Sequence, residues 1–86
     1  MVTDLKIKAI KAWYVKGSVS ILFDDGKEIK FSVALNEKLR NAPEKMAANI
    51  ELICGGTGLH WPELDEDLSI LGILEGRYGK VKNSFV

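Results

Sequence analysis

The segment from Val19 to Val33 constrains the fold most, because apolar and polar residues alternate on both sides of an Asp-Asp-Gly turn. Such alternation is typical of strands with one buried face. The apolar positions are Val19, Ile21 and Phe23 before the turn, and Ile29, Phe31 and Val33 after it. We therefore expect two antiparallel strands that share one apolar face.

The length of the turn follows from the parity of these positions. A two-residue loop of Asp25 and Gly26 would place apolar side chains opposite charged ones. A three-residue loop that starts at Asp24 instead pairs Ile21 with Ile29, so both apolar rows lie on the same face. The sequence predicts this three-residue hairpin, with a type I turn and Gly26 in the left-handed conformation.

A further strand is expected before this hairpin, joined to it by a turn at Lys16-Gly17. Leu5, Ile7 and Ala9 alternate with lysines, and the alternation shifts phase at Ala9-Ile10. The shift predicts a β-bulge, after which the apolar face continues at Ile10, Ala12 and Tyr14.

The second half of the chain mixes short helical and extended segments. We expect helical turns near residues 36–40 and 43–48, strands over 50–54 and 58–61, and a glycine turn between those strands. Ser69 is a suitable N-cap for a last helix that ends at Gly76, and Asp65–Asp67 are expected to form its acidic leading turn. The predicted fold class is α+β: a small antiparallel β-meander with additional short strands and two or three short helices. Residues 1–79 are expected to form one domain and residues 80–86 a flexible tail.

Charge and length limit the classes of function. The 86 residues carry 12 basic and 12 acidic side chains, so a general polyanion binder, which needs a basic surplus, is not expected. Residues 1–43 hold eight basic and five acidic side chains, while residues 44–86 hold four and seven. This +3 and −3 division can be ordinary scatter, or it can orient self-association or a partner.

The cellular compartment is predicted from cysteine content and hydropathy. A single cysteine excludes an internal disulfide and suits a reducing compartment. We find no signal-peptide pattern at the N-terminus and no apolar run of the ~20 residues that a membrane span needs. The expected location is the cytoplasm, with no membrane partner.

The run Gly55–Ser69, GGTGLHWPELDEDLS, gathers residue types that often carry chemistry, but their spacing fits no phosphate or metal motif. The Gly-Lys-Ser/Thr of a Walker loop is absent, and so is the third glycine of a dinucleotide fingerprint. Cys54 and His60 are too few for a structural zinc site, and the acidic positions do not match a calcium loop. We expect no cofactor, no metal and no catalytic residue. Cys54 is expected to be a buried strand end, and His60 to lie on the wetter face opposite Leu59 and Trp61.

Trp13 has two open interpretations. It can pack into the core, or the bulge can turn it outward, where a tryptophan is a candidate hot spot for a partner. Lys6, Lys8 and Lys11 on the same strand could form a basic face for nucleic acid. A solvated strand edge is the simpler interpretation.

Two segments, LFDDGKEIKFSV and GGTGLHWPELDEDLSILGILEG, resemble the family called domain of unknown function 2442, over roughly Leu5 to Arg77. The resemblance implies a small bacterial α+β domain, sometimes fused to or encoded beside helix-turn-helix or toxin-like partners, with no enzymatic activity to carry over. The residues that match the family motif are Trp61, Pro62, Asp65, Asp67 and Leu68. They imply a structural signature in which acidic side chains cap or pin the loop. Leu71 departs from the pattern, since relatives often place a polar residue there, and an exposed Leu71 would favour association.

Three functions follow as hypotheses. The first is a non-enzymatic protein-interaction or regulatory module, antitoxin-like in role, with an unidentified protein partner or a homo-oligomer and with Trp13, His60 and Leu71 on its surface. The second is a small ligand-binding domain or enzyme that uses Cys54, His60 and the acidic segment. The third is a nucleic-acid-associated regulator that uses the three lysines.

Overall fold

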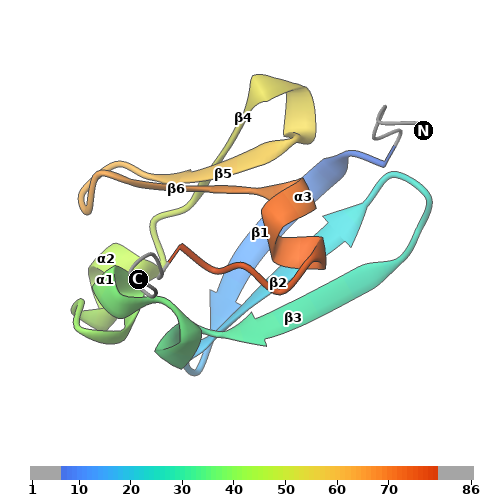
Figure 1. Cartoon of the computed structure of the whole chain (residues 1–86). Helices are drawn as coiled ribbons and strands as arrows, with labels where there is room; N and C mark the ends of the chain where they lie inside the picture. The colour runs from blue at the N-terminus through green and yellow to red at the C-terminus, as the bar shows by residue number, and fades with distance from the viewer. Residues whose placement is uncertain (1–6, 80–86) are drawn as a thin grey trace, which may run out of the picture.

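The computed structural model describes residues 7–79, which form two three-stranded antiparallel sheets with short helices between and after them (Figure 1). The first sheet contains β1 (Ala9–Val15), β2 (Ser18–Phe23) and β3 (Glu28–Ser32); the second contains β4 (Glu51–Ile53), β5 (Gly58–Trp61) and β6 (Glu66–Ser69). The helical elements are η1 (Val33–Leu35), α1 (Glu37–Arg40), α2 (Glu44–Ala47), η2 (Cys54–Gly56) and α3 (Ile70–Leu74). The predicted α+β class is confirmed. The strand expected at Leu5 and the tail over 80–86 lie outside the described residues.

The hairpin between β2 and β3 has the predicted register. Ile21 pairs with Ile29 and Val19 with Phe31. The N–H of Gly26 donates to the carbonyl of Phe23 at 3.0 Å, and Gly26 has φ +90°. Asp25 holds the same turn, since its Oδ1 accepts from the N–H of Lys27 at 3.0 Å. The three-residue loop is therefore confirmed.

The predicted bulge in β1 is also present. Ala9 pairs with Phe23 and Lys11 with Leu22, which leaves Ile10 as the extra, unpaired residue. Ile10 is 58 % exposed, so the expectation that it lies on the apolar face is wrong. The reason is the bulge itself, because the extra residue of a bulge leaves the regular alternation of the strand.

The connection between the two sheets is helical, as expected. Asn36 caps α1, and Pro43 stands at the N-cap of α2. The sequence did not predict η1, which begins where the alternation ends at Val33. The Oγ of Ser32 accepts from the N–H of Ala34 at 3.1 Å and so caps this turn.

The second sheet corrects the expectation for the acidic run. Residues 66–69 form β6, which pairs along β5, instead of an acidic turn that leads into a helix. One reason for the error is that β6 is four residues long and contains a single apolar residue, Leu68, so it shows too little alternation to be recognised. The last helix does start after Ser69, whose Oγ accepts from the N–H of Gly72 at 2.9 Å.

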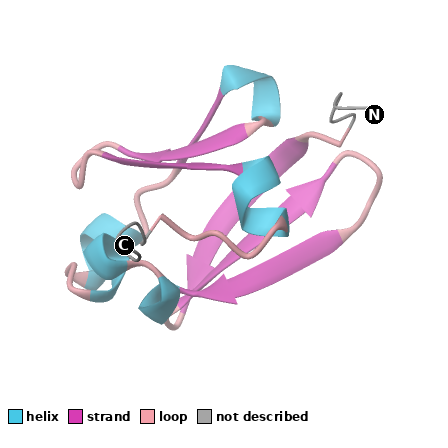
Figure 2. Ribbon diagram, viewed as in Figure 1, coloured by secondary structure: helices cyan, strands magenta, loops and turns pink. Residues whose placement is uncertain are grey.

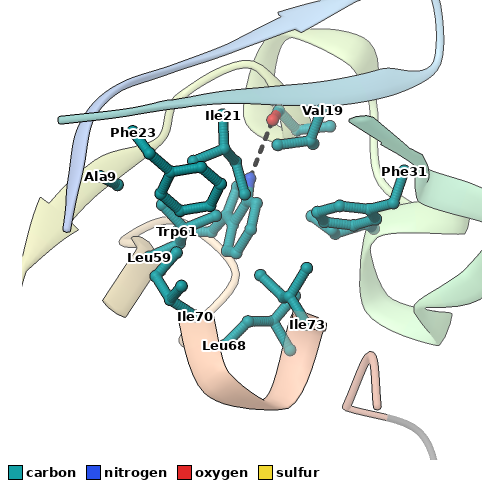
Figure 3. Close-up of a cluster of buried hydrophobic side chains, with 12 residues drawn as sticks. Ala9, Val19, Ile21, Phe23, Phe31, Leu59, Trp61, Leu68, Ile70 and Ile73 are labelled. Carbon is teal, nitrogen blue, oxygen red and sulfur yellow. Dashed lines mark hydrogen bonds between the residues drawn. The ribbon is translucent and has the colours of Figure 1, made fainter. Parts of the chain in front are cut away.

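The hydrophobic core lies between the inner faces of the two sheets, and α3 and the helical connection close its sides (Figures 1 and 2). Figure 3 shows Trp61 at its centre, among side chains from both sheets and from α3. The buried members are Ala9, Val19, Ile21, Phe23, Phe31, Leu39, Ala47, Leu59, Trp61, Leu68, Ile70 and Ile73. The inner faces point toward each other, so the two outer faces point in opposite directions. Within residues 7–79, no helix has the length and apolar character that crossing a membrane requires.

Candidate functional site

The glycine and histidine run forms a turn, a buried strand and a hairpin loop. Leu59 and Trp61 are fully buried, and His60 points to the outer face of the sheet, as the alternation predicted. The indole N–H of Trp61 donates to the carbonyl of Ala47 at 2.9 Å, which ties β5 to α2. Pro62 is exposed in the loop after β5, and Leu68 is buried opposite Leu59. The motif residues Trp61 and Leu68 thus lie in the core.

His60 lies in a row of ionisable side chains that crosses the second sheet. Its strand neighbours are Glu51 on β4 and Asp67 on β6. The Nδ1 of His60 lies 2.5 Å from the Oδ1 of Asp67, and the His60 side chain is 28 % exposed. The hydrogen bond to Asp67 is the largest cause that raises the pKa of His60 above its ordinary value. Desolvation lowers this pKa, and the negative charges of Asp67, Glu51 and Asp65 raise it further.

Cys54 does not join His60. It follows β4 in the turn η2, it is exposed, and it has φ +55°. The expectation of a buried strand end is therefore wrong. The strand ends at Ile53, one residue earlier than expected, and the turn that follows brings Gly56 against the backbone of Ala9, where a Cβ would approach the carbonyl oxygen to 2.5 Å. Across the described part of the chain, no three His, Cys, Asp or Glu side chains come together as a group that could hold a metal.

The acidic side chain that pins the hairpin loop is Glu66, which the sequence analysis did not single out. Its Oε2 accepts from the Nδ2 of Asn36 at 2.7 Å, and its Oε1 lies 3.6 Å from the Nζ of Lys38. Asp65 contributes through its backbone, since its carbonyl accepts from Lys38 at 3.0 Å, and its φ is +52°. Asp67 is exposed and pairs with His60. The family resemblance implied that the side chains of Asp65 and Asp67 hold the loop in place. In the structure, the side chain that does so is Glu66, which lies between them.

Asn36 is the centre of a polar cluster that the sequence analysis missed. The side chain is fully buried, and its Oδ1 accepts from the N–H of Leu39 at 2.9 Å to cap α1. Its Nδ2 also donates to the carbonyl of Tyr78 at 2.6 Å. A Cβ on Gly79 would meet Asn36, Glu66 and Leu68 within 2.9 Å, so the chain passes too close for a side chain there. The one sequence signal was the asparagine before a helical turn, which predicts a cap but not its other partners.

Trp13 lies on the outer face of the first sheet. It is half-buried and is not a member of the core cluster, so the core-packing interpretation is wrong. The Nζ of Lys11 lies 5.3 Å from the centroid of its ring, within the range of a cation–π interaction.

The surface around Trp13 follows from the strand registers, and we call it the Trp13 face. Three rows of residues cross the sheet on this side, and the middle row is Trp13, Ser20 and Lys30. The other two rows are Val15–Ser18–Ser32 and Lys11–Leu22–Glu28. Ser20 is 3 % exposed between Trp13 and Lys30. This face has one aromatic side chain, two apolar ones (Val15 and Leu22) and two lysines.

Leu71 and the remaining lysines lie elsewhere. Leu71 is 47 % exposed on α3, next to the exposed Leu74, as expected for a position that departs from the family pattern. Lys8 is exposed before β1, and Lys6 lies outside the described residues. Lys11 belongs to the Trp13 face.

The two sheets with their helical connection define a small α+β domain whose strand alternation places Trp13 and His60 on opposite outer faces. The sequence matches the family described as protein of unknown function (DUF2442) over residues 9–79, so the chain belongs to this family. A search of curated proteins finds no significant match.

Two solved structures share the fold. A crystal structure of a protein of unknown function from Rhodospirillum rubrum is 31 % identical, with a TM-score of 0.82 over 88 % of this chain and 94 % of that one. A solution NMR structure of an uncharacterized protein from Chromobacterium violaceum is 27 % identical, with a TM-score of 0.75 over 87 % of this chain and 71 % of that one. These relatives support the fold and carry no assigned activity.

Proposed function

We propose that this protein is a non-enzymatic protein-interaction module, with a regulatory or antitoxin-like role, and that its partner binds the Trp13 face. The observation that carries the proposal is the position of Trp13. The ring lies outside the core on the outer face of the first sheet, and Val15 on the same face is 48 % exposed. Tryptophan is the residue type most enriched among interface hot spots.

The composition of the Trp13 face supports a protein partner over a nucleic acid. Lys11 and Lys30 share the face with Glu28, and the whole chain has no net charge. Sheets that bind single strands stack several bases on several aromatic side chains, whereas this face offers one.

The enzymatic alternative would use Cys54, His60 and the acidic segment, and within residues 7–79 no three such side chains form a group that could hold a metal. Cys54 and His60 lie in different environments, and His60 has Asp67 as its hydrogen-bond partner. This alternative makes its own prediction, namely that a metabolite or metal raises the melting temperature of the protein and that His60→Ala abolishes the shift. A broad metabolite and metal screen that raises the melting temperature in no case would contradict the enzymatic alternative.

The test of the proposal is affinity capture from a lysate of the native host, with three versions of the full chain as bait. We expect the same protein to be captured by the wild type and by Leu71→Ala, and lost with Trp13→Ala. Leu71→Ala is the matched control, because it also removes a partly exposed apolar side chain. Equal capture by Trp13→Ala, or reproducible capture of nothing, would contradict the proposal.

A further inference from the structure

The outer faces of the two sheets carry charges of opposite sign. The first sheet belongs to the half of the sequence with a basic surplus, residues 1–43, and the second sheet to the half with an acidic surplus, residues 44–86. The residues of each face decide whether this division reaches the surface. Because the inner faces of the sheets meet at the core, the two outer faces lie on opposite sides of the domain.

The Trp13 face is the basic side. Lys11 and Lys30 contribute two positive charges and Glu28 one negative charge, which leaves one net positive charge on the nine strand residues. Its apolar contact area comes from Trp13 and Val15, with Leu22 partly exposed between Lys11 and Glu28.

The opposite side, which we call the His60 face, is acidic. Its residues are Glu51, Ile53, Gly58, His60, Asp67 and Ser69, which share the outer side of the second sheet by register. Glu51 and Asp67 are exposed and carry two negative charges. Ile53 covers Gly58, where a Cβ would approach its Cγ1 to 3.0 Å, and so places one apolar side chain beside the carboxylates.

The two faces are complementary in kind, since each combines apolar side chains with charges of opposite sign. We propose that copies of this chain associate head to tail, with the Trp13 face of one copy seated on the His60 face of the next. Trp13 packs against Ile53 of the next copy, and Lys11 and Lys30 face its Glu51 and Asp67. The inference rests on the proposed function, because it names the protein that occupies the Trp13 face as a second copy of the chain.

The geometry also sets the form and strength of the association. An interface between two different faces leaves one of each kind free at the ends, so it does not close as a two-fold dimer. The faces contain nine and six strand residues, fewer than the roughly 20–30 residues that each partner contributes to a standard stable interface. We therefore expect reversible association at high protein concentration, weakened by salt because the charges are exposed.

The experiment uses sedimentation velocity of the full chain, from micromolar to millimolar protein, with two variants that each inactivate one face. The first variant combines Trp13→Ala with Lys30→Gln. The second combines Glu51→Gln with Asp67→Asn. All four positions lie outside the core cluster, and circular dichroism checks that both variants keep the wild-type fold.

We expect the wild type to sediment faster as its concentration rises, and each variant alone to remain a monomer. An equimolar mixture of the variants should form dimers and nothing larger, because each variant retains one working face. In about 1 M salt, where the screening length is ~3 Å, the wild-type association should be lost.

Three results would overturn the inference. They are a wild type that stays monomeric at millimolar concentration, a second variant that associates like the wild type, or a variant mixture that stays monomeric. A monomeric wild type that still captures a different host protein through Trp13 would remove this inference and leave the proposed function standing. If the first variant, Trp13→Ala with Lys30→Gln, associates as well as the wild type, the result would count against both the further inference and the proposed function.

Discussion

The two sheets have the same antiparallel, three-stranded topology but are stabilised by different interactions. The inner side of β2 and β3 presents apolar residues in register, such as Val19 opposite Phe31. The inner side of the second sheet has one apolar pair, Leu59 opposite Leu68, and it also pairs Trp61 with the acidic Glu66. Both of these side chains bond to the connection between the sheets, Trp61 to Ala47 and Glu66 to Asn36. Both sheets thus bury apolar side chains, and the second sheet also has polar anchors outside itself.

This difference extends to the surfaces. The first sheet leaves Trp13 on its outer side, whereas the second keeps its tryptophan in the core and exposes carboxylates around His60. The two tryptophans therefore have different environments. Trp61 fills the core, and Trp13 is available for contact with another molecule.

The largest effect is expected from Trp61→Ala, which empties the centre of the core and removes the bond to Ala47. Replacing a buried aromatic residue by alanine costs about 3–5 kcal/mol of unfolding free energy. Chemical denaturation measures this loss, and Trp61→Phe is the control because it retains most of the apolar burial. A loss below ~1 kcal/mol for Trp61→Ala would contradict the assignment of Trp61 to the core.

Asn36→Ala should have the next largest effect. It removes the cap of α1 and the two hydrogen bonds that Nδ2 donates, one to Glu66 and one to the carbonyl of Tyr78. Leaving buried polar partners unsatisfied costs about 1–3 kcal/mol, so we expect a loss of about 2–3 kcal/mol in the same denaturation experiment. Ser32→Ala, which removes the exposed cap of η1, is the matched control and should cost less. Equal losses for the two variants would show that the second sheet does not depend on the Asn36 cluster.

Gly26→Val tests the turn of the first sheet without touching its packing. Nothing lies within 4 Å of a Cβ at this position, so the cost comes from φ +90°, which side chains rarely adopt. We expect a loss of about 1–2 kcal/mol, and a smaller one for Gly26→Asn, because asparagine tolerates positive φ better. Unchanged stability in Gly26→Val would contradict the three-residue turn.

The smallest effect concerns the protonation of His60, the only histidine of the chain. Its folded-state pKa is raised above the ordinary value of about 6.5. The contribution of the His60–Asp67 pair to stability is therefore fully present below that pH and is lost as the pH rises through the folded-state pKa. An NMR titration of the imidazole should show a lower pKa in Asp67→Asn. Identical titrations of the two proteins would refute the role of the hydrogen bond.

The first sheet could be predicted in detail because its information is local. Parity around Asp24–Gly26 determines the register of β2 and β3, and the phase slip at Ala9-Ile10 marks the bulge. Short turns join these strands, so few alternative pairings compete. The positions of His60, Leu59 and Trp61 followed from the same alternation.

The rest could not be predicted because it depends on contacts between distant segments. Asn36 and Glu66 are 30 residues apart, and neither shows a sequence pattern that indicates the other. β6 is too short for alternation to reveal it, and the early turn at Cys54 brings Gly56 against Ala9. The sequence left open whether the bulge turns Trp13 inward or outward. The pairing of Trp13 with Ser20 on β2 determines that it lies on the outer face.

The most direct test of the central claim, that Trp13 belongs to an interaction surface and not to the core, measures stability and association of one variant together. We predict that Trp13→Ala loses about 1 kcal/mol or less of unfolding free energy, yet no longer associates with its partner in sedimentation or capture experiments. A variant that loses as much stability as Trp61→Ala while its association stays at the wild-type level would contradict the account.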